Sequence, residues 1–189
     1  MTEMTHVFVG TATALALTAN TPESIVTALI GGAVGGIISD LEIWSTPQSR
    51  RSQFMVAGLV VILLMIDFLL KGSIWHYNQS KQSTAAMLGI ITFCALAVLG
   101  LFKKNIRHSL LSLLVSSISI FFFCAPILPS FIVGFIAHLA LDILNQSPVF
   151  IFYPHRRGIN LNLCAPDRLI NKLFLMLGIL GTLYFLILY

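Results

Sequence analysis

Residues 128–146 read LPSFIVGFIAHLALDILNQ, and this stretch decides the fold class. A helix that crosses a bilayer needs about 20 mostly apolar residues, and these 19 positions are apolar almost throughout. The two ionisable residues, His138 and Asp142, stand four apart and therefore share one face of a helix. An ionisable group at the centre of a membrane helix costs at least about 2.5–3.5 kcal/mol, so it normally faces a cavity or a partner. The stretch predicts a transmembrane helix that carries a buried polar pair.

The rest of the chain has the same apolar character. Of its 189 residues 57% are apolar and 10% charged, and the mean hydropathy is +0.93, whereas soluble domains carry about 25% charged residues. We expect an all-α, polytopic transmembrane helical bundle that forms one domain over residues 1–189. Its first helix lacks the basic leader of a cleaved signal peptide, so we expect it to be retained. The expected helices number about seven, the first two short and buried, and cover residues 4–19, 22–39, 53–70, 84–102, 108–125, 128–146 and 169–188.

The order of these helices brings scattered donor groups to one membrane face. Because the chain changes face with each crossing, the start of the first helix, the end of the second, the start of the fifth and the end of the sixth all share a face. Imidazole and carboxylate are ligands that suit Zn, Mn or Fe. The alternative is that the same groups pair with one another and join helices without a metal. The sequence predicts a divalent metal site, Zn or Mn with one or two ions, whose ligands are His6, Asp40, Glu42, His108, His138 and Asp142.

Basic residues predict the orientation. The same face collects eight Lys and Arg residues, whereas the opposite face has Lys71 and Lys81. The positive-inside rule then makes this face cytoplasmic, with a cytoplasmic N-terminus and a C-terminus on the other side. This distribution explains the net charge of +4 better than nucleic-acid binding does. A polar loop at residues 146–167 lies on the predicted cytoplasmic face and offers His155, Arg156 and Arg157 to a substrate.

Several short motifs resemble one family. They are Thr5-His6-x-x-x-Gly10, Ser39-Asp40-Leu41-Glu42, Arg107-His108-Ser109, Gly134-x-x-x-His138-Leu-x-Leu-Asp142 and Tyr153-Pro154. In this order and spacing, over residues 5–160, they resemble the YdjM-like membrane-bound metal-dependent hydrolases of the bacterial inner membrane. The family's acidic motif reads P-D-x-D and its histidine motif T-H-S, so Ser39, Glu42 and Arg107 are departures. The resemblance implies metal chemistry at an inner-membrane site.

Three functions fit the sequence. The leading hypothesis is a metal-dependent hydrolase at the cytoplasmic membrane face that cleaves a phosphoester of a lipid or lipid-linked molecule. Asp40 and Glu42 are its candidate catalytic carboxylates, and Glu42 acts either as a ligand or as a general base. Alternatives are a membrane scaffold whose polar residues pair, and a cation or proton transporter. A transport path needs polar residues along its whole length, and the opposite face offers only Asp67, Lys71 and His76.

Overall fold

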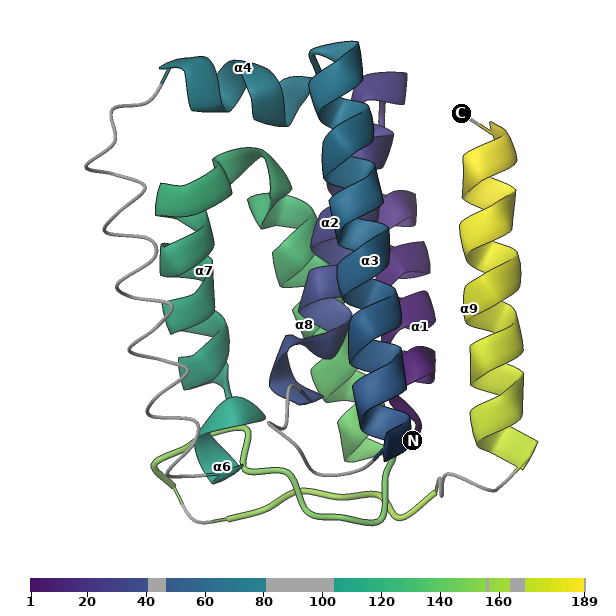
Figure 1. The fold of residues 1–189 in the computed structure, drawn as a ribbon. Coiled ribbons are helices and arrows are strands. Elements are labelled where there is room, and N and C mark those ends of the chain that lie inside the picture. Colours follow the sequence, from purple (N-terminus) through teal and green to yellow (C-terminus); the bar gives the residue numbers. More distant parts are fainter. Residues whose placement is uncertain (41–46, 81–103, 156, 164–168, 189) are drawn as a thin grey trace.

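The computed structural model describes residues 1–40, 47–80, 104–155, 157–163 and 169–188, and in this part the fold consists of helices joined by loops. In this part the only β-type pairing is an isolated bridge between Val149 and Ile159. The helices, shown in Figure 1, are α1 (Glu3–Thr18), α2 (Pro22–Ile37) with the 3-10 turn η1 (Ile38–Asp40), α3 (Pro47–Leu70), α4 (Ser73–Ser80), α6 (Lys104–Arg107), α7 (Leu110–Cys124), the 3-10 turn η2 (Ala125–Ile127), α8 (Leu128–Ile143) and α9 (Leu169–Leu188).

The expected count of about seven helices is wrong for the described residues, which contain six long helices, α1, α2, α3, α7, α8 and α9. Each of the six overlaps an expected apolar block. The seventh block, 84–102, lies outside the described residues. The structure adds two short helices, α4 and α6, that the apolar pattern did not predict because neither is a run of apolar residues.

Within the described residues, four segments are long and apolar enough to cross a membrane: Pro22–Asp40, Arg51–Leu70, Leu110–Ile143 and Leu169–Leu188. Helix α1 has only 16 residues, which correspond to about 24 Å and fall short of a hydrocarbon core of about 30 Å. The third segment is a hairpin in which α7 and α8 run in opposite directions (Figure 1). Pro126 lies in its turn and Pro129 in the first turn of α8, positions where proline's missing N–H is tolerated.

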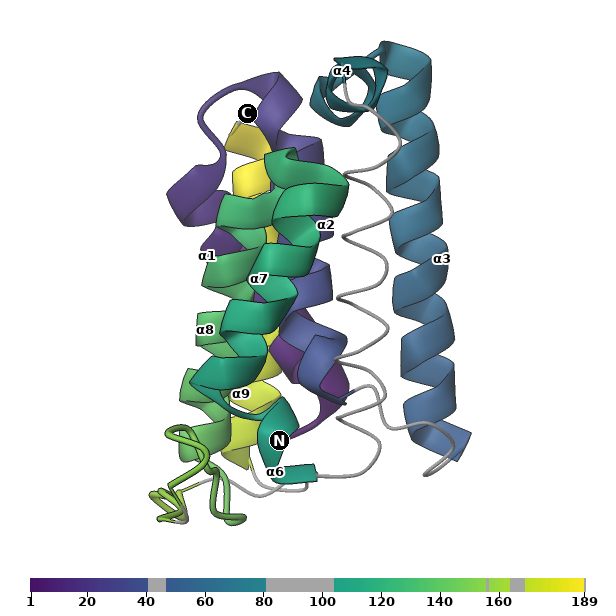
Figure 2. The same cartoon turned by 90° about the vertical axis from the view of Figure 1, so that its left-hand side faces the viewer.

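Outward-facing side chains on the outer helices are apolar. Helix α3 stands at one edge of the bundle (Figure 2), and its Phe54, Ile62 and Leu69 are more than half exposed. Leu169 and Ile187 of α9 are equally exposed. So much exposed apolar surface is typical of a protein that faces lipid rather than water.

Helix α4 covers the bundle end opposite the N-terminus (Figure 1). Its start is fixed by the buried Asp67 carboxylate, which accepts hydrogen bonds from the backbone N–H groups of Ile74 and Trp75. Its Tyr77 hydroxyl donates to the carbonyl of Phe121 near the end of α7. Asp67 therefore caps a helix that closes over the α7–α8 hairpin.

Helices α1, α2 and α8 form the centre of the fold because glycines let their backbones touch. A Cβ atom added at Gly35 would lie 2.4 Å from the carbonyl oxygen of Phe131, and one at Gly36 would lie 2.7 Å from that of His6. A Cβ atom at Gly134 would lie 2.6 Å from the carbonyl oxygen of Gly32. Small residues allow this approach between membrane helices, where packing rather than the hydrophobic effect drives association.

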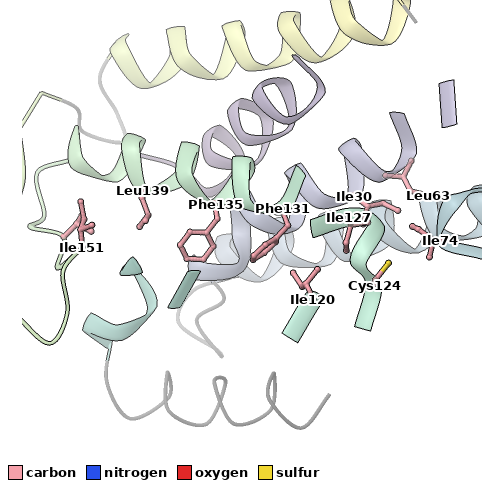
Figure 3. Packing of buried hydrophobic residues seen from close by; sticks show 11 residues of the cluster. Ile30, Leu63, Ile74, Ile120, Cys124, Ile127, Phe131, Phe135, Leu139 and Ile151 are labelled. Atoms are coloured by element: carbon pink, nitrogen blue, oxygen red, sulfur yellow. The ribbon is translucent and has the colours of Figure 1, made fainter. Parts of the chain in front are cut away.

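Apolar packing continues from this centre towards α7. Phe131 and Phe135 of α8 are fully buried, and Figure 3 shows them beside Ile30 of α2 and Ile120 of α7. Leu139 extends the same cluster towards the other end of α8. The next inward-facing position beside it is His138, where the apolar core gives way to polar side chains.

We predict that Gly35→Ala destabilises the protein by about 1–3 kcal/mol, because its Cβ meets backbone that cannot move without shifting α8. Gly58→Ala is the matched control, since a Cβ there has nothing within 4 Å. Reversible unfolding in mixed detergent micelles, followed by circular dichroism, measures both. Equal midpoints for the two variants would contradict the close-contact interpretation.

Candidate metal centre

Five of the predicted ligands meet in space. Four of them line one pocket together with Met1, at the end of the bundle where Figure 1 places the N-terminus. His6 lies one turn into α1, Asp40 ends the η1 turn after α2, and His108 lies between α6 and α7. His138 and Asp142 occupy successive turns near the end of α8. Four separate chain segments thus contribute imidazole or carboxylate groups to one place.

Asp142 is the hub of the cluster. Its Oδ2 lies 2.8 Å from Nδ1 of His108 and 3.0 Å from Nε2 of His138. Its Oδ1 lies 3.5 Å from Nε2 of His6. The side chain is only 8% exposed, so this carboxylate is almost cut off from solvent and depends on these three rings for its partners.

Asp40 closes the cluster from the other side. Its Oδ1 lies 3.8 Å from Nε2 of His138 and 4.0 Å from Nε2 of His108. The side chains of Asp40 and His108 are 19% and 21% exposed, whereas His6 and His138 are buried. The cluster therefore has a closed side at His6 and His138 and an accessible side at Asp40 and His108.

Two overlapping groups could hold a metal ion, His6–His138–Asp142 and Asp40–His108–His138. Within each group the ligand atoms lie within 4.8 Å of one another. Donors bound about 2.1 Å from a tetrahedral Zn would stand about 3.4 Å apart. In the first group Asp142 lies 3.0 Å from Nε2 of His138 and 3.5 Å from Nε2 of His6, and in the second Asp40 lies 3.8 and 4.0 Å from the two histidines. The spacing fits a divalent ion.

The Nδ1 atoms of His138 and His6 also bear on metal binding. Nδ1 of His138 lies 2.8 Å from the carbonyl oxygen of Gly36, to which it donates, so that the Nε2 lone pair is directed into the cluster. Metal-binding histidines usually have such a supporting partner. The buried Nδ1 of His6 has no hydrogen-bond partner among the described residues. A buried polar atom of this kind calls for an explanation such as a bound ion or water.

Neighbouring residues in the motifs position these ligands. The Thr5 hydroxyl donates to Oδ1 of Asn171, which also accepts from the backbone N–H of Thr2, so α9 holds the first turn of α1. Ser109 caps α7 by accepting from the backbone N–H of Ser112. His108 consequently stands just outside a fixed helix start and reaches Asp142. The residues beside the two histidines thus fix the elements that carry them.

A pocket of about 310 Å³ adjoins the cluster. Four of the donors line it, together with Glu3 and the first residues of the loop after α8. Sequence reasoning missed Glu3, although its position three residues before His6 places it on the same face of α1. The lining residues are Met1, Glu3, His6, Asp40, His108, Asp142, Asn145, Ser147, Pro148, Val149 and Phe150.

Of the other predicted site residues, the two that the structure describes, His155 and Arg157, do not line this pocket. Glu42 and Arg156 lie outside the described residues. His155 and Arg157 are exposed on the loop between α8 and α9 and do not line the pocket wall. Their roles stay predictions.

Comparison with known proteins identifies the family. The model of the family described as YdjM inner membrane protein matches residues 1–189. The chain belongs to this family. No curated protein and no solved structure matches it. The family description and the four apolar segments together support a location in the membrane, and the resemblance read from the sequence motifs is confirmed.

We predict that the purified protein binds Zn²⁺ and that His138→Ala lowers the Zn²⁺ affinity by more than about 100-fold. Removing a residue that only hydrogen-bonds to a metal ligand costs roughly 10- to 100-fold, and His138 would be a ligand itself. The control is His76→Ala, because His76 is exposed on α4 at the opposite end. Competition with a chromophoric chelator in detergent gives both affinities. Unchanged affinity in His138→Ala, with a folded protein, would remove this residue from the site.

Proposed function

We propose that this protein is a metal-dependent hydrolase that cleaves a phosphoester of a lipid or lipid-linked molecule at the cytoplasmic face of the inner membrane. The observation that carries the proposal is the juxtaposition of five imidazole and carboxylate groups with a pocket at one end of a membrane bundle. Buried ionisable groups in a membrane protein mark functional sites more often than structural ones.

His6, His138 and Asp142 would hold a Zn or Mn ion on the buried side, with Asp40 and His108 towards the pocket. Such an ion lowers the pKa of water and stabilises charge on phosphoryl oxygens. His138 offers one nitrogen, because the other is engaged by Gly36. Since both candidate groups need that nitrogen, the described residues favour one ion, and a second would have to share the Asp142 carboxylate.

The loop after α8 supports a lipid substrate. Its Val149 and Phe150 line the pocket, while Phe152, Leu161 and Leu163 are more than half exposed. Backbone hydrogen bonds from Leu161 and Leu163 to the carbonyls of Ile143 and Leu144 hold the loop against the end of α8. Exposed apolar side chains at a bundle end suit the membrane interface, so one loop would contact both lipid and pocket.

Charged residues of this loop are candidates for headgroup recognition. Arg157 is exposed on the same loop as His155, and a guanidinium can bind phosphate through two parallel hydrogen bonds. We propose that Arg157, Arg156 and His155 contact the headgroup outside the pocket, and that Glu42 completes the metal ligands or acts as a base. The excess of basic residues at this end favours a cytoplasmic orientation.

A scaffold remains the second candidate, because the His–Asp distances of 2.8 and 3.0 Å are also those of hydrogen-bonded pairs. If the protein is a scaffold, the purified protein should contain no stoichiometric metal, whereas a hydrolase should contain it. A transporter has less support, since Asp67 at the opposite end is occupied in capping α4. Proteoliposomes that carry a cation or proton flux would favour transport instead.

We predict that the protein, reconstituted with Zn²⁺ or Mn²⁺ in vesicles, releases product from phosphoester lipids, and that chelation abolishes this activity. His138→Ala and Asp142→Ala should each lower turnover by at least about 100-fold, because each removes a group that would bind the ion. His76→Ala should match the wild type. Wild-type turnover in both site variants would exclude this mechanism.

A further inference from the structure

Glu3 is the carboxylate in the pocket wall that the metal-ligand groups do not use. It lies in the first turn of α1, one turn before His6, and it lines the pocket together with Asp40, His108 and Asp142. It belongs to neither group of candidate ligands. It therefore lies in the pocket wall beside the donor cluster.

Helix α3 holds this carboxylate in place. The hydroxyl of Ser52 donates to Oε2 of Glu3, and Ser52 is itself buried, with 8% of its surface exposed. A carboxylate has two oxygens and about four acceptor sites, so one such bond orients the group and leaves it able to accept a proton. The same stretch of α3 contacts the turn that carries Asp40, through Nε2 of Gln53 and the Asp40 carbonyl, 3.4 Å apart. Glu3 is therefore an oriented group and not a free surface acid.

We infer that Glu3, rather than Glu42, is the general base of the proposed hydrolysis, on which this inference rests. Glu3 takes a proton from the attacking water as the water oxygen bonds to phosphorus. The bond from phosphorus to the leaving alcohol oxygen breaks, that oxygen takes a proton from a solvent water on the opposite side of phosphorus, and the Glu3 carboxylic acid gives its proton to the resulting hydroxide through solvent. The sum is one water consumed, with an alcohol and a phosphate product released, and Glu3 returns to its carboxylate form.

With Glu3 as the base, neither Asp142 nor Asp40 has to accept a proton during turnover. Asp142 contacts three histidine rings and Asp40 contacts two, so protonating either would weaken the cluster that holds the ion. Glu3 shares no ion pair with those rings among the described residues. A separate base can gain and lose a proton in each turnover without releasing the ligands.

The test compares Glu3→Gln with Glu23→Gln in the full-length protein. Glu23 is a matched control because it also lies in the first turn of a helix, α2, but is exposed and remote from the pocket. Three quantities are measured: Zn²⁺ affinity by chelator competition, affinity of the Zn²⁺-loaded protein for inorganic phosphate, and kcat and KM on phosphoester lipid vesicles.

We expect Glu3→Gln to lower kcat by about 10²- to 10⁴-fold, the usual effect of losing a general base, with KM and Zn²⁺ affinity within a factor of a few of the wild type. Phosphate should bind at least as tightly, because a negative charge beside the pocket is gone. Ser52→Ala should lower kcat less, since it frees Glu3 without removing it. Glu23→Gln should change nothing.

Two results would overturn the assignment while leaving the hydrolase intact: an active wild type with unchanged kcat in Glu3→Gln, or a large loss of Zn²⁺ affinity in that variant, which would make Glu3 a ligand. An inactive wild type that binds Zn²⁺ would instead defeat the proposed function itself. If Glu3→Gln fails to fold, Ser52→Ala with normal Zn²⁺ affinity and normal kcat overturns the assignment.

Discussion

Backbone contact among α1, α2 and α8 is the constraint on which the rest of the structure depends. At Gly35, Gly36 and Gly134 there is no room for even a methyl group. This closeness lets a carbonyl of α2 reach the ring of His138 and sets His6 against it, with ring centroids 4.3 Å apart. Larger side chains would separate the helices and, with them, the ligands. The glycines are therefore needed to bring the helices that carry the donors close enough together.

Much of the fold could be predicted because the apolar blocks are long and the turns are marked by proline. The expected helix 169–188 coincides with α9, and the expected break near Pro126 is present. The expected number of helices, about seven, exceeds the six long helices of the described part, and the block at 84–102 lies outside that part. Helix α4 escaped prediction because its start depends on the side chain of Asp67, seven residues earlier.

The donor cluster could be anticipated from the alternation of membrane faces, which a chain cannot avoid when its helices are joined by short connections. Alternation does not show which residues on a face reach the donor cluster and which stay exposed on a loop. It assigned His155 and Arg157 to the same side as His138, yet the structure places both on the exposed part of a loop. Glu3, by contrast, lines the pocket but was not predicted to do so. Its spacing of three residues from His6 places it on the same face of α1, but only the fold shows that this face borders the pocket and that Ser52 of α3 binds the carboxylate.

The hydrogen bonds of Asn171 have a consequence for biosynthesis. This residue lies in the last helix, yet its side chain fixes the first turn of the first one, next to His6. A ribosome synthesises α9 after all the other described helices. The first turn of α1, next to His6, therefore lacks the contacts of Asn171 until α9 has been made. Among the helices described, α9 is therefore the one whose synthesis must precede the final positioning of His6.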